Sequence, residues 1–284
     1  MTRRAAFLDD RGVVRVSGED ATGFLQGLLT NDVAKLGPHE ARYAALLLPQ
    51  GKILFDFLVV HAPADTGATF LLDCAAAQAS DLVKRLGLYR LRAKILVADE
   101  SADHGVIAYW HGEPENAPGG VFYADPRLSA LGHRAILPRA KAVAVGEASV
   151  GEYEALRISL GVPKGGVDFA YGEAFPHEAD MDLFHGLDFE KGCYVGQEVV
   201  SRMRHRGEVR KRVVRVHLDG PAPAPGATVM DGELRVGVLG SSSGRQALAL
   251  LRLDRVEEAK AAGRALSAAG VGLVMAEGEG VGRP

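Results

Sequence analysis

Short apolar runs separated by Gly, Pro and Asn turns dominate the first third of the chain. The segment "GVVRVSGEDATGFLQGLLTND" predicts a strand followed by a helix that begins at Ser17. The runs "ARYAALLL" and "KILFDFLVV" flank Pro49-Gln50-Gly51, which predicts a β-hairpin. After the strand-like "TFLLDC", the segment "AAAQASDLVKRLGLYRLRAKILVAD" predicts a helix and one more strand. This part of the chain is therefore expected to mix α and β structure.

The second half changes in character from helix and loop to strands alone. "GEYEALRISLG" predicts a helix, and "VPKGGVDFAYGEAFPHEAD" predicts a loop of a length that is uncommon unless it is functional. From Val209 onward, "VRKRVVRVHL", "ELRVGVLGS", "QALALLRL" and "ALSAAGVGLVMA" are short apolar runs between Gly and Pro turns. That pattern is typical of a small closed β-barrel.

The length and the apolar content indicate several domains and no spanning segment. With 284 residues, of which 47% are apolar, the chain exceeds what one hydrophobic core usually holds. The most apolar stretch, "AALLLPQGKILFDFLVV", is interrupted by Pro, Gly, Lys and Asp, so we do not expect it to span a bilayer. The start "MTRRAAFLDDRG" lacks the apolar run of a secretion signal. We expect a cytoplasmic protein without a membrane partner.

The formal net charge of −3 conceals an uneven distribution. Residues 171–190 hold six acids and no Lys or Arg, whereas residues 191–215 hold eight Lys or Arg and two acids. Such runs often form solvated faces that pair with each other. They also suit an anion-binding wall, because arginine side chains bind carboxylate and phosphate groups in a bidentate manner. Both interpretations remain open from the sequence.

The stretch "EKGCYVGQEVVSRMRHRG" places Cys193 between two glycines, beside Lys191 and ahead of a series of arginines. Positive potential favours a thiolate, so an accessible reactive thiol is one interpretation. A free cysteine is also among the residues most often buried, and this interpretation suits Cys74 in "TFLLDC" better. Two cysteines are too few for a disulfide framework or a four-thiolate site, and no metal site is predicted.

"KGCYVGQE" with the following Arg202 resembles the signature of the YgfZ family, folate-binding relatives of the glycine-cleavage T-protein. This family includes mitochondrial factors that help to mature [4Fe-4S] proteins. "GEDATGFLQGLLTNDV", "LRISLGVPKGG", "PHEAD" and "RVGVLGSSS" are similar to other segments of the family. The resemblance implies an α+β fold of the T-protein type, a three-domain ring with a C-terminal β-barrel. Its domains would be 1–50 with 140–208 for folate binding, 51–139 as a second α+β domain, and 209–284 as the barrel.

Two departures separate this chain from the T-proteins that it resembles. T-proteins carry two adjacent acids where this sequence has Phe55 and Asp56, and the first of the two is catalytic. They also hold the pterin with a glutamate where "RISLG" has Ser159. Conversely, T-proteins lack the cysteine that stands here at position 193. The resemblance therefore implies that the working group is the thiol instead of the carboxylate.

The sequence leads to three functional hypotheses. The first is a folate-binding accessory factor for the assembly or repair of [4Fe-4S] proteins, in a family also linked to tRNA modification and oxidative stress. The second is a tetrahydrofolate-dependent aminomethyltransferase or other one-carbon transferase that uses Asp56. The third takes residues 202–215 as an RNA contact, against which the acidic balance elsewhere argues, so no stable nucleic-acid binding is expected. Whether the protein is an enzyme is left open.

The resemblance assigns roles to eleven residues. Cys193 and Lys191 would carry the chemistry, with the cysteine as a redox-active thiol or a transient ligand. Tetrahydrofolate or a derivative would be the cofactor, and iron-sulfur client or assembly proteins would be the partners. The implied folate contacts are Asn31, Tyr43, Asp56, Glu178, Gly196, Gln197, Glu198, Arg202 and Arg206.

Overall fold

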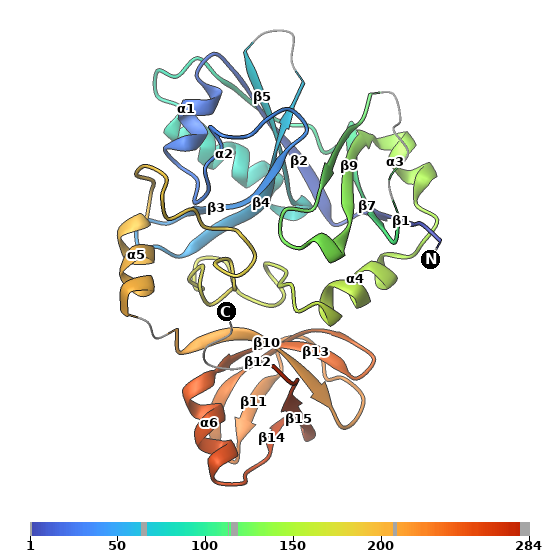
Figure 1. Ribbon diagram of the computed structural model, residues 1–284, viewed down its shortest axis with the longest axis vertical. Coiled ribbons are helices and arrows are strands. Elements are labelled where there is room, and N and C mark those ends of the chain that lie inside the picture. Colours follow the sequence, from blue (N-terminus) through green and yellow to red (C-terminus); the bar gives the residue numbers. More distant parts are fainter. Residues whose placement is uncertain (1, 64–66, 113, 115–118, 207–208, 279–284) are drawn as a thin grey trace. The chain divides into compact units, whose positions relative to one another are not determined.

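The computed structural model describes residues 2–63, 67–112, 114, 119–206 and 209–278 (Figure 1). Its contacts divide the chain into two units, Met1–Tyr153 with Phe184–Gln197, and Glu154–Leu183 with Glu198–Pro284. The first unit contains β1 (Arg4–Leu8), β2 (Arg11–Gly18), α1 (Ala21–Gln26), β3 (Ala41–Leu47), β4 (Ile53–Ala62), β5 (Ala68–Ala75), the 3₁₀ turn η1 (Ala76–Gln78), α2 (Ala79–Tyr89), β6 (Leu96–Asp99), β7 (His104–Trp110), β8 (Val121–Ala124), η2 (Ser129–Leu131), β9 (His133–Pro138) and α3 (Arg139–Val145). Helix α4 (Val150–Ser159) and helix α5 (Gln197–Arg206) each cross from one unit to the other. The second unit continues with β10 (Lys211–Leu218), β11 (Thr228–Asp231), β12 (Leu234–Ser243), β13 (Gln246–Arg252), α6 (Leu253–Ala261), β14 (Leu266–Ala268) and β15 (Val271–Met275).

A five-stranded antiparallel sheet in the order β3-β4-β5-β2-β6 forms the larger part of the first unit. Strands β3 and β4 form the hairpin that the apolar runs predict, with Tyr43 opposite Leu58. Helix α2 packs against β2 and β6 through apolar residues spaced three and four apart, Ala79, Leu82 and Leu86. These side chains join a buried core that also contains Leu25, Leu29, Phe57, Phe70 and Leu72.

The predicted start of the first helix is wrong. Ser17 lies in β2, where it pairs with Thr69 of β5 and Leu96 of β6, and the helix α1 begins at Ala21. The hydroxyl side chain of Ser17 resembles a helix cap in the sequence, but the ladder bonds on both sides of β2 satisfy the backbone there.

A second sheet of four strands in the order β1-β7-β9-β8 completes the first unit, with α3 packed against β7. Buried ionic contacts join it to the larger sheet. The guanidinium of Arg134 on β9 donates to Asp73 on β5 over 2.6 Å and to Asp125 over 3.1 Å. Asp73 also accepts from Arg11 of β2 over 2.6 Å, and Asp125 accepts from Arg127 over 2.7 Å. Because the carboxylates and guanidiniums alternate, each buried charge has an opposite partner.

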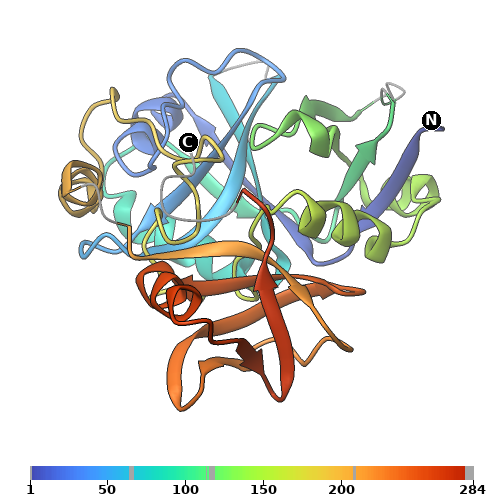
Figure 2. The ribbon, with the colours of Figure 1, turned by 60° about the horizontal axis from the view of Figure 1, so that its bottom comes forward.

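The second unit contains a closed barrel in the order β10-β13-β12-β11-β14-β15, with β15 pairing back onto β10 (Figure 2). The barrel predicted from Val209 onward is therefore confirmed. Part of the long predicted loop is tied to it, because Asp168 accepts from the backbone N–H of Ser241 over 2.6 Å. Arg157 of α4 donates to the same carboxylate over 2.9 Å.

The mixed α+β class agrees with the sequence. The three-domain division stays a prediction, although β3 and β4, on the two sides of residue 50, belong to one sheet. None of the helices in the described residues is long and apolar enough to cross a membrane.

Candidate functional site

The motif loop, Lys191–Gly196, connects an irregular segment of the first unit to helix α5. The side chains of this loop differ in their exposure to solvent. Lys191 and Tyr194 are buried, at 6% and 8% exposure, whereas Cys193 between them is exposed. Val195 packs against the core of the larger sheet. The loop is therefore anchored on both sides of the thiol, while the thiol itself faces solvent.

Lys191 points inward, where its ammonium donates to three backbone carbonyls. The distances are 2.9 Å to Gln26, 2.5 Å to Leu29 and 2.9 Å to Asn31. The three carbonyls belong to the end of α1 and the turn that follows, where helix carbonyls have no partner within the helix. Burial lowers the pKa of Lys191 to about 8, although the negative charges of Asp32 and Asp188 act in the opposite direction.

The turn after α1 holds the segment that precedes the motif loop. The hydroxyl of Thr30 donates to the carbonyl of Gly186 over 2.7 Å, and the carbonyl of Thr30 accepts from the backbone N–H of Asp188 over 3.0 Å. The amide of Asn31 donates to the carbonyls of Tyr43 and His185, over 2.8 and 2.6 Å. Both amide hydrogens of Asn31 are thus used within the protein, while its predicted folate contact stays a prediction.

Gly196 fits the loop against the β3–β4 hairpin. Its φ of +83° is in the left-handed region, which disfavours other residues. A Cβ at this position would lie 2.7 Å from the carbonyl oxygen of Leu48 and 3.1 Å from the Cα of Gly51. The predicted Gly196 is therefore required by the backbone. Gly192, by contrast, has nothing within 4 Å of a hypothetical Cβ.

Tyr43 and Asp56 form a buried pair on adjacent strands of the same hairpin. The Tyr43 hydroxyl donates to the Asp56 carboxylate over 3.0 Å. Burial, together with the negative charge of Asp56, raises the pKa of Tyr43 well above its usual value, so the phenol remains a donor. The Arg127 guanidinium lies 5.9 Å from the centre of the Tyr43 ring. Phe55, at the position of the T-protein acid, is buried in the core.

Four predicted site residues are thus connected within the first unit. Lys191 donates to Asn31, Asn31 donates to Tyr43, and Tyr43 donates to Asp56. The sequence did not indicate Thr30 or Asp188, which hold the loop by hydrogen bonds. Both stand beside residues that it did indicate, but bonds to the backbone have no sequence signature.

The remaining predicted residues lie at or after the division between the units. Gln197 is the first residue of α5, and the exposed Glu198 accepts from Arg202 one turn later, over 2.8 Å. Glu178 belongs to the second unit, where it accepts from the backbone N–H of Phe175 over 3.0 Å. The side chain of Arg206 is outside the described residues. The folate roles of these five residues stay predictions.

Part of the basic run is paired with the acidic run. Arg212 of β10 donates to the carboxylates of Asp180 and Asp182, over 2.9 and 2.7 Å. This observation favours mutual ion pairing over an open anion-binding wall at Arg212.

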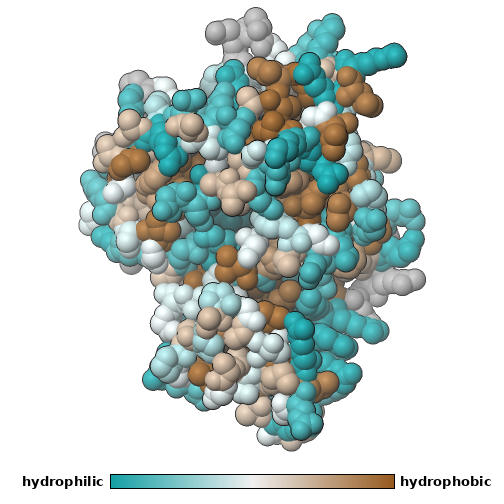
Figure 3. Space-filling view, turned by 180° about the vertical axis from the view of Figure 1, so that it is seen from behind, coloured by the Kyte–Doolittle hydropathy of each residue, from teal (hydrophilic) through white to brown (hydrophobic). Residues whose placement is uncertain are grey.

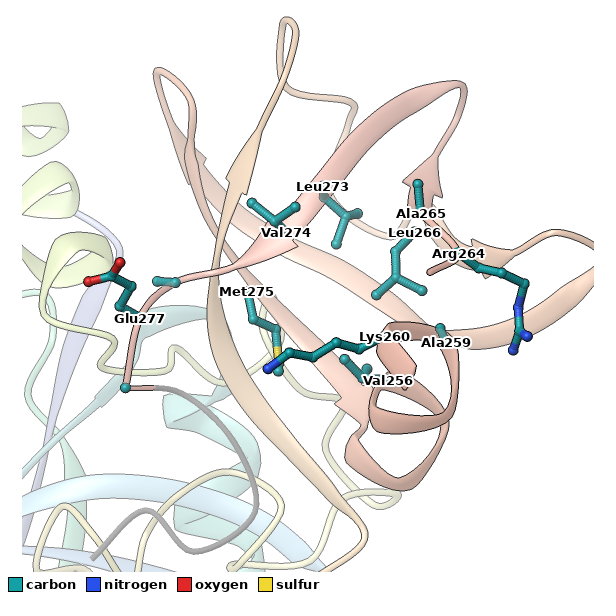
Figure 4. A pocket seen from close by; sticks show the side chains of 12 residues that line it. Val256, Ala259, Lys260, Arg264, Ala265, Leu266, Leu273, Val274, Met275 and Glu277 are labelled. Carbon is teal, nitrogen blue, oxygen red and sulfur yellow. The ribbon is translucent and has the colours of Figure 1, made fainter. Parts of the chain in front are cut away.

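A cavity of about 350 Å³ lies in the second unit, between α6 and β15 (Figure 4). Leu266, Leu273 and Met275 line it, and the side chain of Lys260 extends across it. None of the predicted site residues contributes to its walls. No sequence pattern marks this cavity, because its apolar residues are also those of the barrel core.

The barrel of this chain resembles that of a known domain family. The family model of the CAF17 C-terminal β-barrel domain matches residues 210–278. The iron-sulfur cluster assembly factor IBA57 of Mus musculus is 34% identical over 278 residues, which cover 88% of this chain and 78% of the relative. The chain belongs to the IBA57 family. Human IBA57 is 32% identical with the same two coverages, and the Mycosarcoma maydis homologue is 36% identical over 81% of this chain. The chain spans only 61% of the fungal protein.

The named IBA57 relatives are mitochondrial, and this contradicts the prediction of a cytoplasmic protein. The prediction failed because it rested on the lack of an apolar secretion signal. The lack of an apolar run argues against secretion, but mitochondrial transit segments are amphipathic and do not need such a run.

The IBA57-family chain also resembles a solved structure over most of its length. The glycine cleavage system aminomethyltransferase T of Bartonella henselae superposes with a TM-score of 0.74, at 18% identity, covering 96% of this chain and 84% of that one. The predicted α+β fold of the T-protein type with a C-terminal barrel is confirmed. At this identity the likeness concerns the fold alone.

Proposed function

We propose that this chain acts in the assembly or repair of [4Fe-4S] proteins, with Cys193 as a transient ligand of the cluster that is passed on. The observation that carries the proposal is the exposed thiol on a loop anchored by the buried Lys191 and Tyr194. A thiol held in this manner is accessible to a partner protein, and the anchors fix where the partner meets it. The names of the IBA57 relatives, which are iron-sulfur cluster assembly factors, support the same role.

The proposed chemistry is reversible ligation. Cys193 gives up its proton to solvent, and the resulting thiolate forms one sulfur–iron bond with the cluster, which is cargo. Cluster irons are usually held by four cysteine thiolates. The chain has two cysteines, and Cys74 is buried in β5. No group of three metal-ligating side chains was found among the described residues. The other ligands would therefore come from a partner protein, and bond exchange with that partner would release the cluster.

Replacement of the thiol tests this role directly. Cys193→Ser in cells that depend on this chain should lower the activity of [4Fe-4S] enzymes, most strongly under oxidative stress, without changing the thermal stability of the protein. Cys74→Val is the matched control, since it replaces a buried thiol by an apolar group of similar size. Full enzyme activity with Cys193→Ser, in a strain where loss of the chain abolishes that activity, would rule out Cys193 as the working group.

Folate binding, and the narrower likeness to the YgfZ family, belong to the same proposal. The T-protein type of fold is compatible with a folate, and the buried Tyr43–Asp56 pair offers polar groups to a pterin. The partners in this proposal are a reduced folate and iron-sulfur client or assembly proteins. Calorimetric titration of the purified chain with tetrahydrofolate tests this part separately from the thiol.

Aminomethyl transfer is the second candidate, and the fold likeness is the observation that favours it. The geometry argues against it, because Asp56 is buried and accepts from Tyr43, and Phe55 occupies the position of the catalytic acid. Turnover of an aminomethylated carrier protein by the purified chain would favour the transferase. Absence of turnover beside measurable folate binding would favour the assembly factor.

A further inference from the structure

Helix α2 ends in a compact turn that leads to the edge strand β6. The backbone N–H of Arg90 donates to Gly87 over 3.3 Å, that of Ala93 to Arg90 over 2.8 Å, and that of Ile95 to Ala93 over 3.0 Å. These bonds hold residues 84–96, the leucine-arginine turn, in one defined shape. The backbone that carries these side chains is therefore held in place.

Three leucines of this turn are turned toward solvent. The exposed fractions are 71% for Leu88, 90% for Leu91 and 59% for Leu96, and Leu91 is the most exposed large apolar side chain among the described residues. On the rear face of the molecule, apolar groups lie beside strongly polar ones at the upper right of the view (Figure 3). Single exposed leucines need no explanation, but three within nine residues form a local apolar patch.

The backbone at Leu91 is a second and independent observation. Its φ of +44° is left-handed, and it follows Arg90, the C-cap residue of α2. Glycine is the usual residue at this position, because a Cβ is disfavoured there. A leucine in this left-handed conformation, with its side chain in water, improves neither the helix end nor the core. Such a residue is typical of a functional surface.

Unpaired positive charge surrounds these leucines. Residues 79–98 hold five Lys or Arg and one acid, in a chain whose formal net charge is −3. Lys84 pairs with Asp81 over 2.9 Å, and Lys94 pairs with Glu19 over 2.9 Å. The side chains of three arginines have no hydrogen-bond or ion-pair partner within the described part of the chain: Arg85, Arg90 and Arg92.

We infer that the leucine-arginine turn is a docking surface for an anionic lipid bilayer. Leucines beside arginines match the boundary between acyl chains and phosphate headgroups, where apolar insertion and electrostatic attraction add together. Guanidinium groups also bind phosphate oxygens in a bidentate manner. An acidic protein is the competing partner, but leucine is under-represented among the residues that dominate protein interfaces. The earlier expectation of no membrane partner rested on the interrupted apolar stretches, which cannot span a bilayer. A contact at the bilayer surface needs no spanning helix, so it is compatible with that observation.

Vesicle sedimentation with the full chain tests this surface. We expect it to sediment with phosphatidylcholine vesicles that contain about 30 mol% phosphatidylglycerol and to remain in solution with phosphatidylcholine alone. Arg90→Gln/Arg92→Gln should weaken binding about 25-fold, because each cation near such a surface contributes about fivefold. The matched control is Arg245→Gln, which removes an exposed arginine of the barrel unit and should bind as the unmodified chain does.

Leu91→Gly separates a docking role from a structural one. The change should weaken vesicle binding about tenfold, since an inserted side chain is lost, while the unfolding temperature stays equal or rises because glycine suits the left-handed backbone. Equal sedimentation with neutral and anionic vesicles, or unchanged binding by both variants, would overturn the proposal. No sedimentation with anionic vesicles would also overturn it, and an acidic protein partner would then be the better explanation.

Discussion

The Nζ of Lys191 lies 2.5 Å from the carbonyl oxygen of Leu29, a residue 162 positions earlier in the chain. The same ammonium donates to two further carbonyls of that region. The lysine of the motif therefore positions the loop that carries Cys193 and keeps its charge turned away from solvent. Its contribution to the proposed function is the placement of the thiol.

Lys191→Met should destabilise the protein. The carbonyls of Gln26, Leu29 and Asn31, two of them buried and that of Gln26 partly buried, would lose this donor, which should lower the free energy of unfolding by about 3 kcal/mol. Urea unfolding measures the change. Lys35→Met is the control, because Lys35 is an exposed lysine that makes one ion pair, with Asp32, and its loss should destabilise the protein clearly less. Equal effects of the two changes would show that the three bonds contribute little.

The two thiols should differ strongly in reactivity. Burial raises the pKa of Cys74 to about 12, whereas Cys193 is exposed, so an alkylating probe near pH 7.5 should label Cys193 at least about 100-fold faster. Mass spectrometry of the digested protein gives both rates. Cys193→Ser should remove the fast phase. Similar rates, or labelling of Cys193 only after unfolding, would contradict the accessible thiol.

Local pattern in the sequence was sufficient for the hairpin and the barrel. The runs on either side of Pro49 are short and apolar, and only a few turn residues separate them, so the pairing of β3 with β4 follows from that short separation. The strands after Val209 were predicted for the same reason. Local pattern failed at Ser17, where the pairing of β2 with two strands from elsewhere in the chain outweighs the preference of a serine for a helix start.

The function of Lys191 was beyond the sequence. A lysine next to a cysteine suggests a charge that activates a thiol, but its three partners are main-chain carbonyls far away in the chain. Every residue has such a carbonyl, so no residue type marks it. The path from Asn31 through Tyr43 to Asp56 was partly predictable, because the resemblance already indicated each of these side chains.

Gly196→Ala should disturb the loop more than Gly192→Ala. Alanine at 196 would need a φ of +83° and would place its Cβ 2.7 Å from the carbonyl oxygen of Leu48. We expect a loss of about 2 kcal/mol in the free energy of unfolding. Gly192 is open, so alanine there should change stability by less than about 0.5 kcal/mol. Thermal unfolding of both variants measures the difference, and equal melting temperatures would refute the proposed fit.

The ionic contacts between the two sheets should make the first unit sensitive to acid. Two arginines, Arg127 and Arg134, hold the pKa of the buried Asp125 at about 2, below the usual value near 4. A carboxyl group whose pKa is lower in the folded than in the unfolded protein stabilises the fold at any pH above the unfolded-state pKa. This stabilisation is lost as the pH falls toward the folded-state pKa. Protonation of Asp125 alone should therefore lower the free energy of unfolding by about 2 kcal/mol as the pH falls from 4 to 2.

The acid effect is measured by urea unfolding at several pH values. The Asp125→Asn variant should be less stable at pH 7, since two buried guanidiniums lose a negatively charged partner. Its free energy of unfolding should also fall less steeply between pH 4 and pH 2. Asp81→Asn, which changes an exposed carboxyl on α2, should leave the pH profile as it is. The prediction fails if the slope of Asp125→Asn equals that of the unmodified chain.

Tetrahydrofolate should bind more through its glutamate tail than through its pterin. The T-protein acids are replaced by Phe55 and Ser159, so the pterin would have fewer charged partners, while a polyglutamate tail needs cations. Arg212 is already paired with acids, whereas Arg202 is an exposed arginine that pairs with Glu198 on the surface, a contact that a ligand can easily exchange. We therefore expect triglutamyl tetrahydrofolate to bind more tightly than the monoglutamyl form.

Calorimetric titration at two salt concentrations tests the tail contact. Affinity should fall as salt rises, because exposed ion pairs are screened over about 8 to 10 Å near physiological ionic strength. Arg202→Gln should reduce the advantage of the triglutamyl form, and Arg245→Gln, on the barrel, should not. Failure of both folates to bind below about 1 mM would remove folate from the proposed function and leave the thiol untouched. Equal, salt-independent binding of both would show that the tail has no cationic partner and that the pterin is the recognised group.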